Sequence, residues 1–130
     1  MRAVDTNVLV RLLVRDDAEQ VRVAEAFTSG GAWVSHLVLA EVMWVLDAVY
    51  ERTAQQIATA IEMLLNHKDL TIQDADVVTQ ALGHFRKRPA LGFSDCLVLE
   101  IARKVGHIPL GTFDRDLSKL EGTKRLPHGI

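Results

Sequence analysis

The alternation of short β-like segments with longer helical patterns constrains this chain more than any other feature of its sequence. Short apolar runs predict strands at residues 1–4, 32–34, 70–72 and 108–111. Between these runs the apolar residues recur at helical spacing. Because strands that alternate with helices pair in parallel through right-handed crossovers, we expect a three-layer α/β/α fold. Its central sheet should be mainly parallel, with four or five short strands.

Capping signals indicate where several of the helices begin. Asp17 with Gln20, and Thr53 with Gln56, match the pattern in which a side chain at the helix start accepts from a backbone N–H three residues on. Asp74 is a third candidate cap. Together with the apolar spacing, these signals predict helices at about 6–14, 17–27, 35–50, 53–65, 74–88 and 95–106, and a short polar helix at 115–120.

The composition is that of one globular domain. The chain has 130 residues, of which 48% are hydrophobic and 25% charged, so we expect a single domain over residues 1–130. The lone cysteine, Cys96, excludes an intramolecular disulfide and a multi-cysteine zinc site. No uncharged stretch approaches the roughly 18 residues of a membrane span. A cytoplasmic protein without membrane partners is the expectation.

The net charge of -2 hides an uneven distribution of charged residues. Residues 1–84 hold 6 basic and 12 acidic side chains, whereas residues 85–130 hold 9 basic and 5 acidic ones. The basic residues of the C-terminal part would bind a phosphate backbone if they gathered on one rim of the fold. Separate solvated charges are the simpler interpretation. These residues are Arg86, Lys87, Arg88, Arg103, Lys104, Arg115, Lys119, Lys124 and Arg125.

Four carboxylates stand in apolar surroundings, namely Asp5, Glu41, Asp95 and Asp114. Three of them follow a predicted strand or open the next helix, where the crevice of an α/β fold lies. An ionised carboxylate in a dehydrated place is unfavourable unless a cation or hydrogen-bond donors compensate it. Mg²⁺ and Mn²⁺ favour such oxygen ligands. The sequence therefore predicts a metal site. In the alternative interpretation Asp5 and Asp95 cap helices, Glu41 pairs with an Arg, and Asp114 makes a turn.

The segments that carry these four acids resemble known motifs. Val4–Leu9, Ser35–Glu41, Phe93–Asp95 and Thr112–Asp114 are similar, in order and approximate spacing, to the four acidic motifs of PIN-domain ribonucleases. The resemblance covers essentially the whole chain, and the length is similar to that of the VapC toxins of toxin-antitoxin operons. The ordered quartet ending in Thr-Phe-Asp is its most specific part.

This resemblance implies a metal-dependent endoribonuclease that hydrolyses a phosphodiester bond with an activated water. Asp5, Glu41, Asp95 and Asp114 map onto the catalytic acids. Asp5, Asp95 and Asp114 are the implied holders of Mg²⁺ or Mn²⁺, with Glu41 a ligand through water or a residue that shapes the pocket. The implied partners are an RNA substrate, a cognate antitoxin that wraps the toxin, and a second copy of the chain in a homodimer.

Other residues take auxiliary roles in this interpretation. Asn7 maps onto the family's polar residue beside the first Asp, and Thr6 and Thr112 offer hydroxyls near the crevice, with Thr112 the better candidate for orienting a carboxylate or a water. Asp116 is the candidate for an additional acid, because Glu100 lies five residues past Asp95 and points to another helix face.

The run Arg86, Lys87 and Arg88 is the densest basic segment of the chain. It is a candidate for binding RNA phosphates. A solvated helix end favoured by the helix dipole is an equally good interpretation.

Two other functions fit the same acids. A Mg²⁺-dependent phosphatase-like enzyme would use Asp5 as nucleophile, but such chemistry usually has a Lys after a late strand, and Gly111–Phe113 supplies none. A non-catalytic dimeric interaction module with a degenerate acidic pocket is the second alternative. It should keep its binding after Asp5→Asn, whereas an enzyme should lose activity and keep its fold.

Overall fold

Strands and helices alternate along the chain in the expected order. The computed structural model describes residues 1–127, so the last three residues of the domain expected over 1–130 lie outside the described residues. The strands are β1 (Arg2–Ala3), β2 (Ala32–Val34), β3 (Leu70–Ile72), β4 (Leu110–Thr112) and β5 (Thr123–Arg125). The helices are α1 (Thr6–Val14), α2 (Ala18–Thr28), α3 (His36–Ala48), α4 (Ala54–Leu65), α5 (Ala75–Lys87) and α6 (Phe93–Lys104).

The expected elements need four adjustments. The fourth strand lies at Leu110–Thr112 instead of 108–111, and the polar helix expected at 115–120 is a short 3-10 turn, η2 (Leu117–Lys119). A second 3-10 turn, η1 (Pro89–Leu91), follows α5. The fifth strand, β5, has the sequence Thr-Lys-Arg and contains no apolar run that would predict a strand. Its hydrogen-bonded pairing with β4 holds it in the extended conformation.

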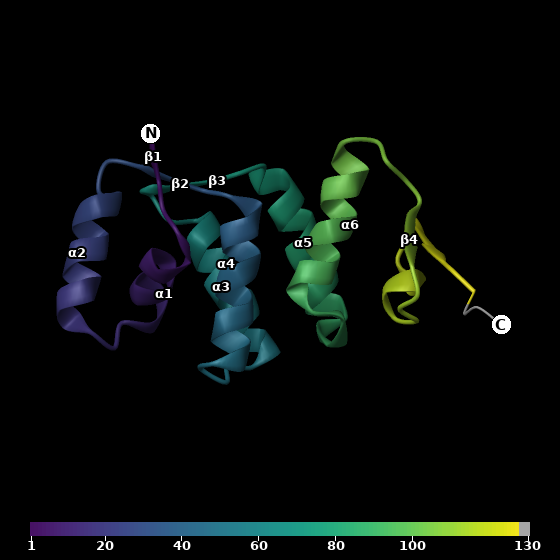
Figure 1. Cartoon of the computed structure of the whole chain (residues 1–130), viewed down its shortest axis with the longest axis horizontal. Helices are drawn as coiled ribbons and strands as arrows, with labels where there is room; N and C mark the ends of the chain where they lie inside the picture. The colour runs from purple at the N-terminus through teal and green to yellow at the C-terminus, as the bar shows by residue number, and fades with distance from the viewer. Residues whose placement is uncertain (128–130) are drawn as a thin grey trace. The chain divides into compact units, whose positions relative to one another are not determined.

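The chain divides into two compact units, Met1–Ala75 and the residues from Asp76 onward (Figure 1). In the first unit, β1, β2 and β3 form a parallel sheet in that order. Helix α1 packs against both α2 and α3, and α4 packs against β3. Buried apolar side chains such as Leu9, Val34 and Ile61 form the core of this unit.

Capping confirms two of the predicted helix starts in the first unit. The Asp17 carboxylate accepts from the Gln20 N–H, and Thr53 with Gln56 makes a complete capping box. Each cap satisfies a backbone N–H that the first turn leaves without an intrahelical partner. The local sequence thus determines where α2 and α4 begin.

In the second unit, β4 and β5 pair in parallel, with Thr112 beside Arg125. Helices α5 and α6 contribute the aromatic pair Phe85 and Phe93, whose ring centroids are 6.2 Å apart in an edge-to-face arrangement. Every strand pair in the described chain is parallel, although the strands form a sheet of three and a sheet of two. The expected three-layer α/β class of fold is confirmed.

Glu100 is buried in the second unit with a partner on each side. Its carboxylate lies 3.0 Å from His84 Nε2 and 3.2 Å from Arg103 Nε. Arg103 also donates to the Glu121 carbonyl oxygen. Glu100 therefore joins α5 to α6 and, through Arg103, to the turn before β5.

Cys96 is fully buried in α6, and burial raises the pKa of its thiol to about 11. It is a small core residue, as expected of a free cysteine in an apolar segment. Within residues 1–127, no helix is both long enough and apolar enough to cross a membrane.

Candidate functional site

Asp5 lies two residues after the end of β1, at the N-cap position that precedes the first turn of α1. Its side chain makes no capping hydrogen bond and is exposed. Asp5 therefore occupies the N-cap position of α1 without capping the helix through its side chain. The positive end of the α1 dipole favours a carboxylate at this place, so the strand end and the helix start together present a free anionic group.

Glu41 is connected to the start of α1 by a short hydrogen bond. Thr6 Oγ1 donates to Glu41 Oε2 over 2.6 Å. The sequence left open an ion pair between Glu41 and an arginine, but its partner is a hydroxyl next to Asp5. Because α1 packs on α3, two acids that are 36 positions apart in sequence lie on either side of one threonine.

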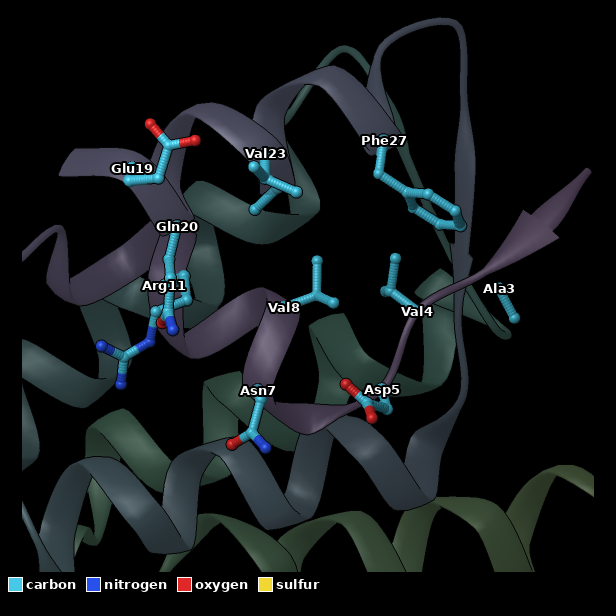
Figure 2. A pocket seen from close by; sticks show the side chains of 11 residues that line it. Ala3, Val4, Asp5, Asn7, Val8, Arg11, Glu19, Gln20, Val23 and Phe27 are labelled. Atoms are coloured by element: carbon cyan, nitrogen blue, oxygen red, sulfur yellow. The ribbon is translucent and has the colours of Figure 1, made fainter. Parts of the chain in front are cut away.

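A groove of about 630 Å³ runs along β1, α1 and α2 in the first unit, and Asp5 and Asn7 stand at one end of it (Figure 2). Val8, Val23 and Phe27 point into the groove and give it an apolar floor. Charged and polar groups stand at its other end, where Arg11, Glu19 and Gln20 lie. Asn7 is exposed. An amphipathic ligand would match this distribution of side chains.

Asp95 lies in the first turn of α6 and is partly buried. Desolvation by burial raises its pKa, and the negative charge of Asp114 raises it further. The second unit therefore brings together two of the predicted carboxylates. Such mutual repulsion is what a bound divalent cation relieves.

Asp114 follows β4 and is held by its own backbone. Its N–H donates to Thr112 Oγ1 over 3.0 Å, and its Oδ1 accepts from the Leu117 N–H over 2.8 Å. The turn interpretation of Asp114 is thus correct as far as it goes. Thr112 was expected to orient a carboxylate or a water, and in the structure its hydroxyl oxygen fixes the Asp114 backbone. Among the described residues, Asp114 Oδ2 has no hydrogen bond and can face a ligand.

Two other acids take different positions. Asp116 lies 3.6 Å from Lys119 Nζ, and both side chains are half exposed. Glu100 belongs to the buried network with His84 and Arg103. The doubt about Glu100 as a pocket residue agrees with this placement, while the auxiliary role of Asp116 stays a prediction.

The donor set fits a hard divalent cation, because every candidate ligand is a carboxylate oxygen. The first unit supplies Asp5 and Glu41, and the second supplies Asp95 and Asp114. Among residues 1–127, neither unit by itself brings three acidic, histidine or cysteine side chains into a group that could hold a metal ion. Each unit therefore offers a pair of acids and not a complete ligand set.

The basic run at the end of α5 is exposed, as both of its interpretations require. Arg86 and Lys87 stand in the last turn of α5, and Arg88 follows it.

Sequence reasoning did not predict one polar contact near β2. The N–H of His36 donates to Gln73 Oε1 over 2.9 Å, which joins the start of α3 to the segment after β3. His36 is 8% exposed, and its Nε2 has no hydrogen-bond partner among the described residues. No spacing in the sequence relates positions 36 and 73, because sheet pairing brings them together.

The chain matches the PIN domain family over residues 2–122, a range that contains all four predicted acids and most of both units. PIN domains are generally nucleases, and PIN-domain nucleases generally use divalent metal ions. No curated protein and no solved structure gives a significant match to the chain.

Proposed function

The chain belongs to the PIN domain family, and from this membership we propose that it is a metal-dependent endoribonuclease that hydrolyses phosphodiester bonds of RNA. One observation carries the proposal within this chain. Asp95 is partly buried beside the negative charge of Asp114, and both effects raise its pKa. Folding alone gains nothing from this pair, whereas a divalent cation at these oxygens would compensate it.

Asp5, Asp95 and Asp114 are the proposed metal ligands, with Mg²⁺ or Mn²⁺ as the ion. When bound, such an ion lowers the pKa of its water and stabilises charge on the leaving oxygen. Asp114 keeps Oδ1 on the Leu117 N–H, so that its other oxygen has a fixed direction. The carboxylate of Asp5, which makes no capping hydrogen bond at the start of α1, is the third proposed ligand.

Glu41 is the proposed group that orients the attacking water or accepts its proton. The hydrogen bond from Thr6 restricts one of its oxygens and leaves the other for a water molecule. Asn7 is exposed beside Asp5, and its amide can donate to a phosphate oxygen of the substrate.

The test is cleavage of total RNA by the purified protein, with Mg²⁺ or Mn²⁺ and with EDTA. We expect discrete cleavage that EDTA abolishes and that Asp95→Asn and Asp114→Asn reduce by at least a hundredfold, on the order expected for groups that stabilise the transition state. Asp47→Asn is the matched control, because Asp47 is an exposed acid on α3 outside the proposed site. Cleavage that persists in EDTA, or wild-type rates in the Asp95 and Asp114 variants, would contradict the proposal.

We further propose that the protein is the toxin of a toxin-antitoxin pair and that a segment of the antitoxin occupies the groove between α1 and α2. The groove offers Val8, Val23 and Phe27 to an apolar helix face. Its end at Asp5 and Asn7 (Figure 2) suits a basic side chain. An amphipathic segment with one basic end would thus cover the groove and neutralise a proposed metal ligand.

Co-expression with the protein encoded beside this chain tests the partner. Val23→Glu should abolish co-purification and inhibition of RNA cleavage, because it places a charge in the groove. Val49→Glu, at an apolar side chain that is 62% exposed and outside the groove, should change neither. A neighbouring protein that neither binds nor inhibits would contradict the toxin assignment and leave the nuclease proposal standing.

A homodimer is the last part of this proposal. Leu37 and Trp44 are 79% and 65% exposed and lie seven residues apart on one face of α3. Light scattering should show a dimer that Trp44→Glu converts to a monomer. Met63→Glu, at an equally exposed apolar residue of α4, should leave the dimer intact.

A further inference from the structure

Three basic side chains of the second unit are neutralised by acids. Each forms an ion pair with a carboxylate at 3.0 to 3.6 Å. A basic residue that is paired in this way contributes little net potential to the surface. The pairs are Arg103 with Glu100, Lys104 with Asp76, and Lys119 with Asp116.

Three other basic side chains gather around the segment that carries Asp114. Arg115 follows Asp114 directly, and on β5 Lys124 lies beside Gly111 and Arg125 beside Thr112. All three are exposed, and among the described residues none of them has an ion pair. The register of two paired strands, and not the sequence order, therefore brings one basic residue to each face of β5 beside the end of β4.

An exposed aromatic residue lies in the same segment, between the end of β4 and Arg115. Phe113 is 56% exposed and lies between Thr112 and Asp114. The hydrogen bond from the Asp114 N–H to Thr112 Oγ1 closes a tight turn around it. Exposing so much of a phenyl ring is unfavourable in water, so a ligand that covers the ring would recover that free energy.

We propose that Phe113, Arg115, Lys124 and Arg125 form a binding platform for single-stranded RNA next to Asp114. Phe113 stacks on an unpaired base, and the three cations contact the phosphates on either side of it. Aromatic rings among basic side chains are the usual means of holding a single strand without reading its sequence. This inference rests on the proposed ribonuclease function and names its substrate class.

The platform favours a single strand over a duplex. A base that is paired and stacked in a helix presents no free face to a phenylalanine, whereas an unpaired base does. Phosphates alone would be contacted equally in both.

The experiment is equilibrium binding of a fluorescein-labelled 12-nucleotide oligouridine, in EDTA so that no cleavage occurs. Phe113→Ala should weaken binding by roughly 5- to 150-fold, the range found for the loss of one stacked base. Val105→Ala is its control, because Val105 is also exposed, at 62%, and lies in the same unit away from Asp114. We expect the control to change binding by less than about twofold.

The contribution of the cations is measured by the salt dependence of the same binding. Arg125→Ala should reduce the slope of log affinity against log salt concentration by about 0.7, the value for one phosphate contact on a single strand. Lys104→Ala should leave the slope unchanged, because Lys104 is already paired with Asp76. A 12-base-pair duplex should bind at least tenfold more weakly than the single strand and should not respond to Phe113→Ala.

Equal losses for Phe113→Ala and Val105→Ala would overturn the platform, as would tighter binding of the duplex. Metal-dependent cleavage that Asp114→Asn abolishes would then still support the ribonuclease proposal. If the wild-type protein neither binds nor cleaves RNA, the ribonuclease proposal itself fails. Phe113→Trp provides a second variant, and the platform predicts binding at least as tight as that of the wild type.

Discussion

Thr6 Oγ1 donates a hydrogen bond of 2.6 Å to Glu41 Oε2, joining the first residue of α1 to the middle of α3. The same threonine follows Asp5 in sequence, so one residue sets the position of two acids. Hydrogen bonds to ionised carboxylates are stronger than neutral ones. This contact therefore restrains a side chain that would otherwise be free to rotate at an exposed position.

Thr6→Val tests the function of that contact. The variant keeps the shape of the side chain and removes the donor, so Glu41 loses its fixed orientation. We expect the rate of RNA cleavage to fall by about tenfold, equivalent to ~1.4 kcal/mol of transition-state stabilisation. Thr6→Ser should restore most of the rate because it keeps the hydroxyl. An unchanged kcat in Thr6→Val would show that the contact is only structural.

Asp95 predicts a dependence of stability on pH. Its pKa is raised by burial and by Asp114, so the folded state favours the protonated carboxyl. The associated stability is present at low pH and is lost as the pH rises through the pKa of the folded state. In EDTA, Asp95→Asn should therefore have a higher Tm than the wild type at pH 7, and the difference should shrink towards pH 3.

The control for this experiment is Asp47→Asn, which removes an exposed acid outside the proposed site. Its Tm difference from the wild type should be small at both pH values. Adding Mg²⁺ at pH 7 should raise the Tm of the wild type and not that of Asp95→Asn, because an ion that binds only the folded state stabilises it. A lower Tm for Asp95→Asn at pH 7 would contradict the role assigned to charge repulsion.

Local patterns predicted the helices and four of the strands because apolar spacing and capping are encoded by neighbouring residues. The same reasoning placed Asp5 and Asp114 just after short strands, and in the structure each lies two residues past the end of a strand. It did not find β5, whose Thr-Lys-Arg sequence has no strand pattern of its own. It also missed the partner of Glu41, because packing of α1 on α3 and not sequence spacing brings Thr6 to it.

Glu100 illustrates the same limit in the second unit. The sequence indicated only that it points away from Asp95. Its contacts with His84 and Arg103 depend on how α5 and α6 pack. A buried carboxylate must be paired, which explains why Glu100 has both partners. Whether Glu100 is buried depends on the packing of the helices, and the local sequence does not determine it.

Arg103→Ala should destabilise the protein by roughly 1–3 kcal/mol, because it removes a charged partner from the buried Glu100 carboxylate. The adjacent Lys104 is the matched comparison. It pairs with the exposed Asp76, where water screens the attraction, so Lys104→Ala should lower the free energy of unfolding by less than Arg103→Ala does. Urea denaturation of the two variants measures the difference. Equal losses would show that Arg103 contributes through packing and not through Glu100.

Two glycines predict opposite effects of the same substitution. Gly83 lies in α5 with nothing within 4 Å of an added Cβ, so Gly83→Ala should stabilise the protein by about 0.5–1 kcal/mol through helix propensity. Gly122 has φ +91°, and an added Cβ would lie 2.9 Å from Arg103 Nη1. Gly122→Ala should therefore destabilise by at least about 1 kcal/mol, from the strained backbone and the displaced guanidinium. Thermal unfolding should give shifts of opposite sign, and a Gly122→Ala protein as stable as the wild type would show that the turn before β5 adapts without Arg103.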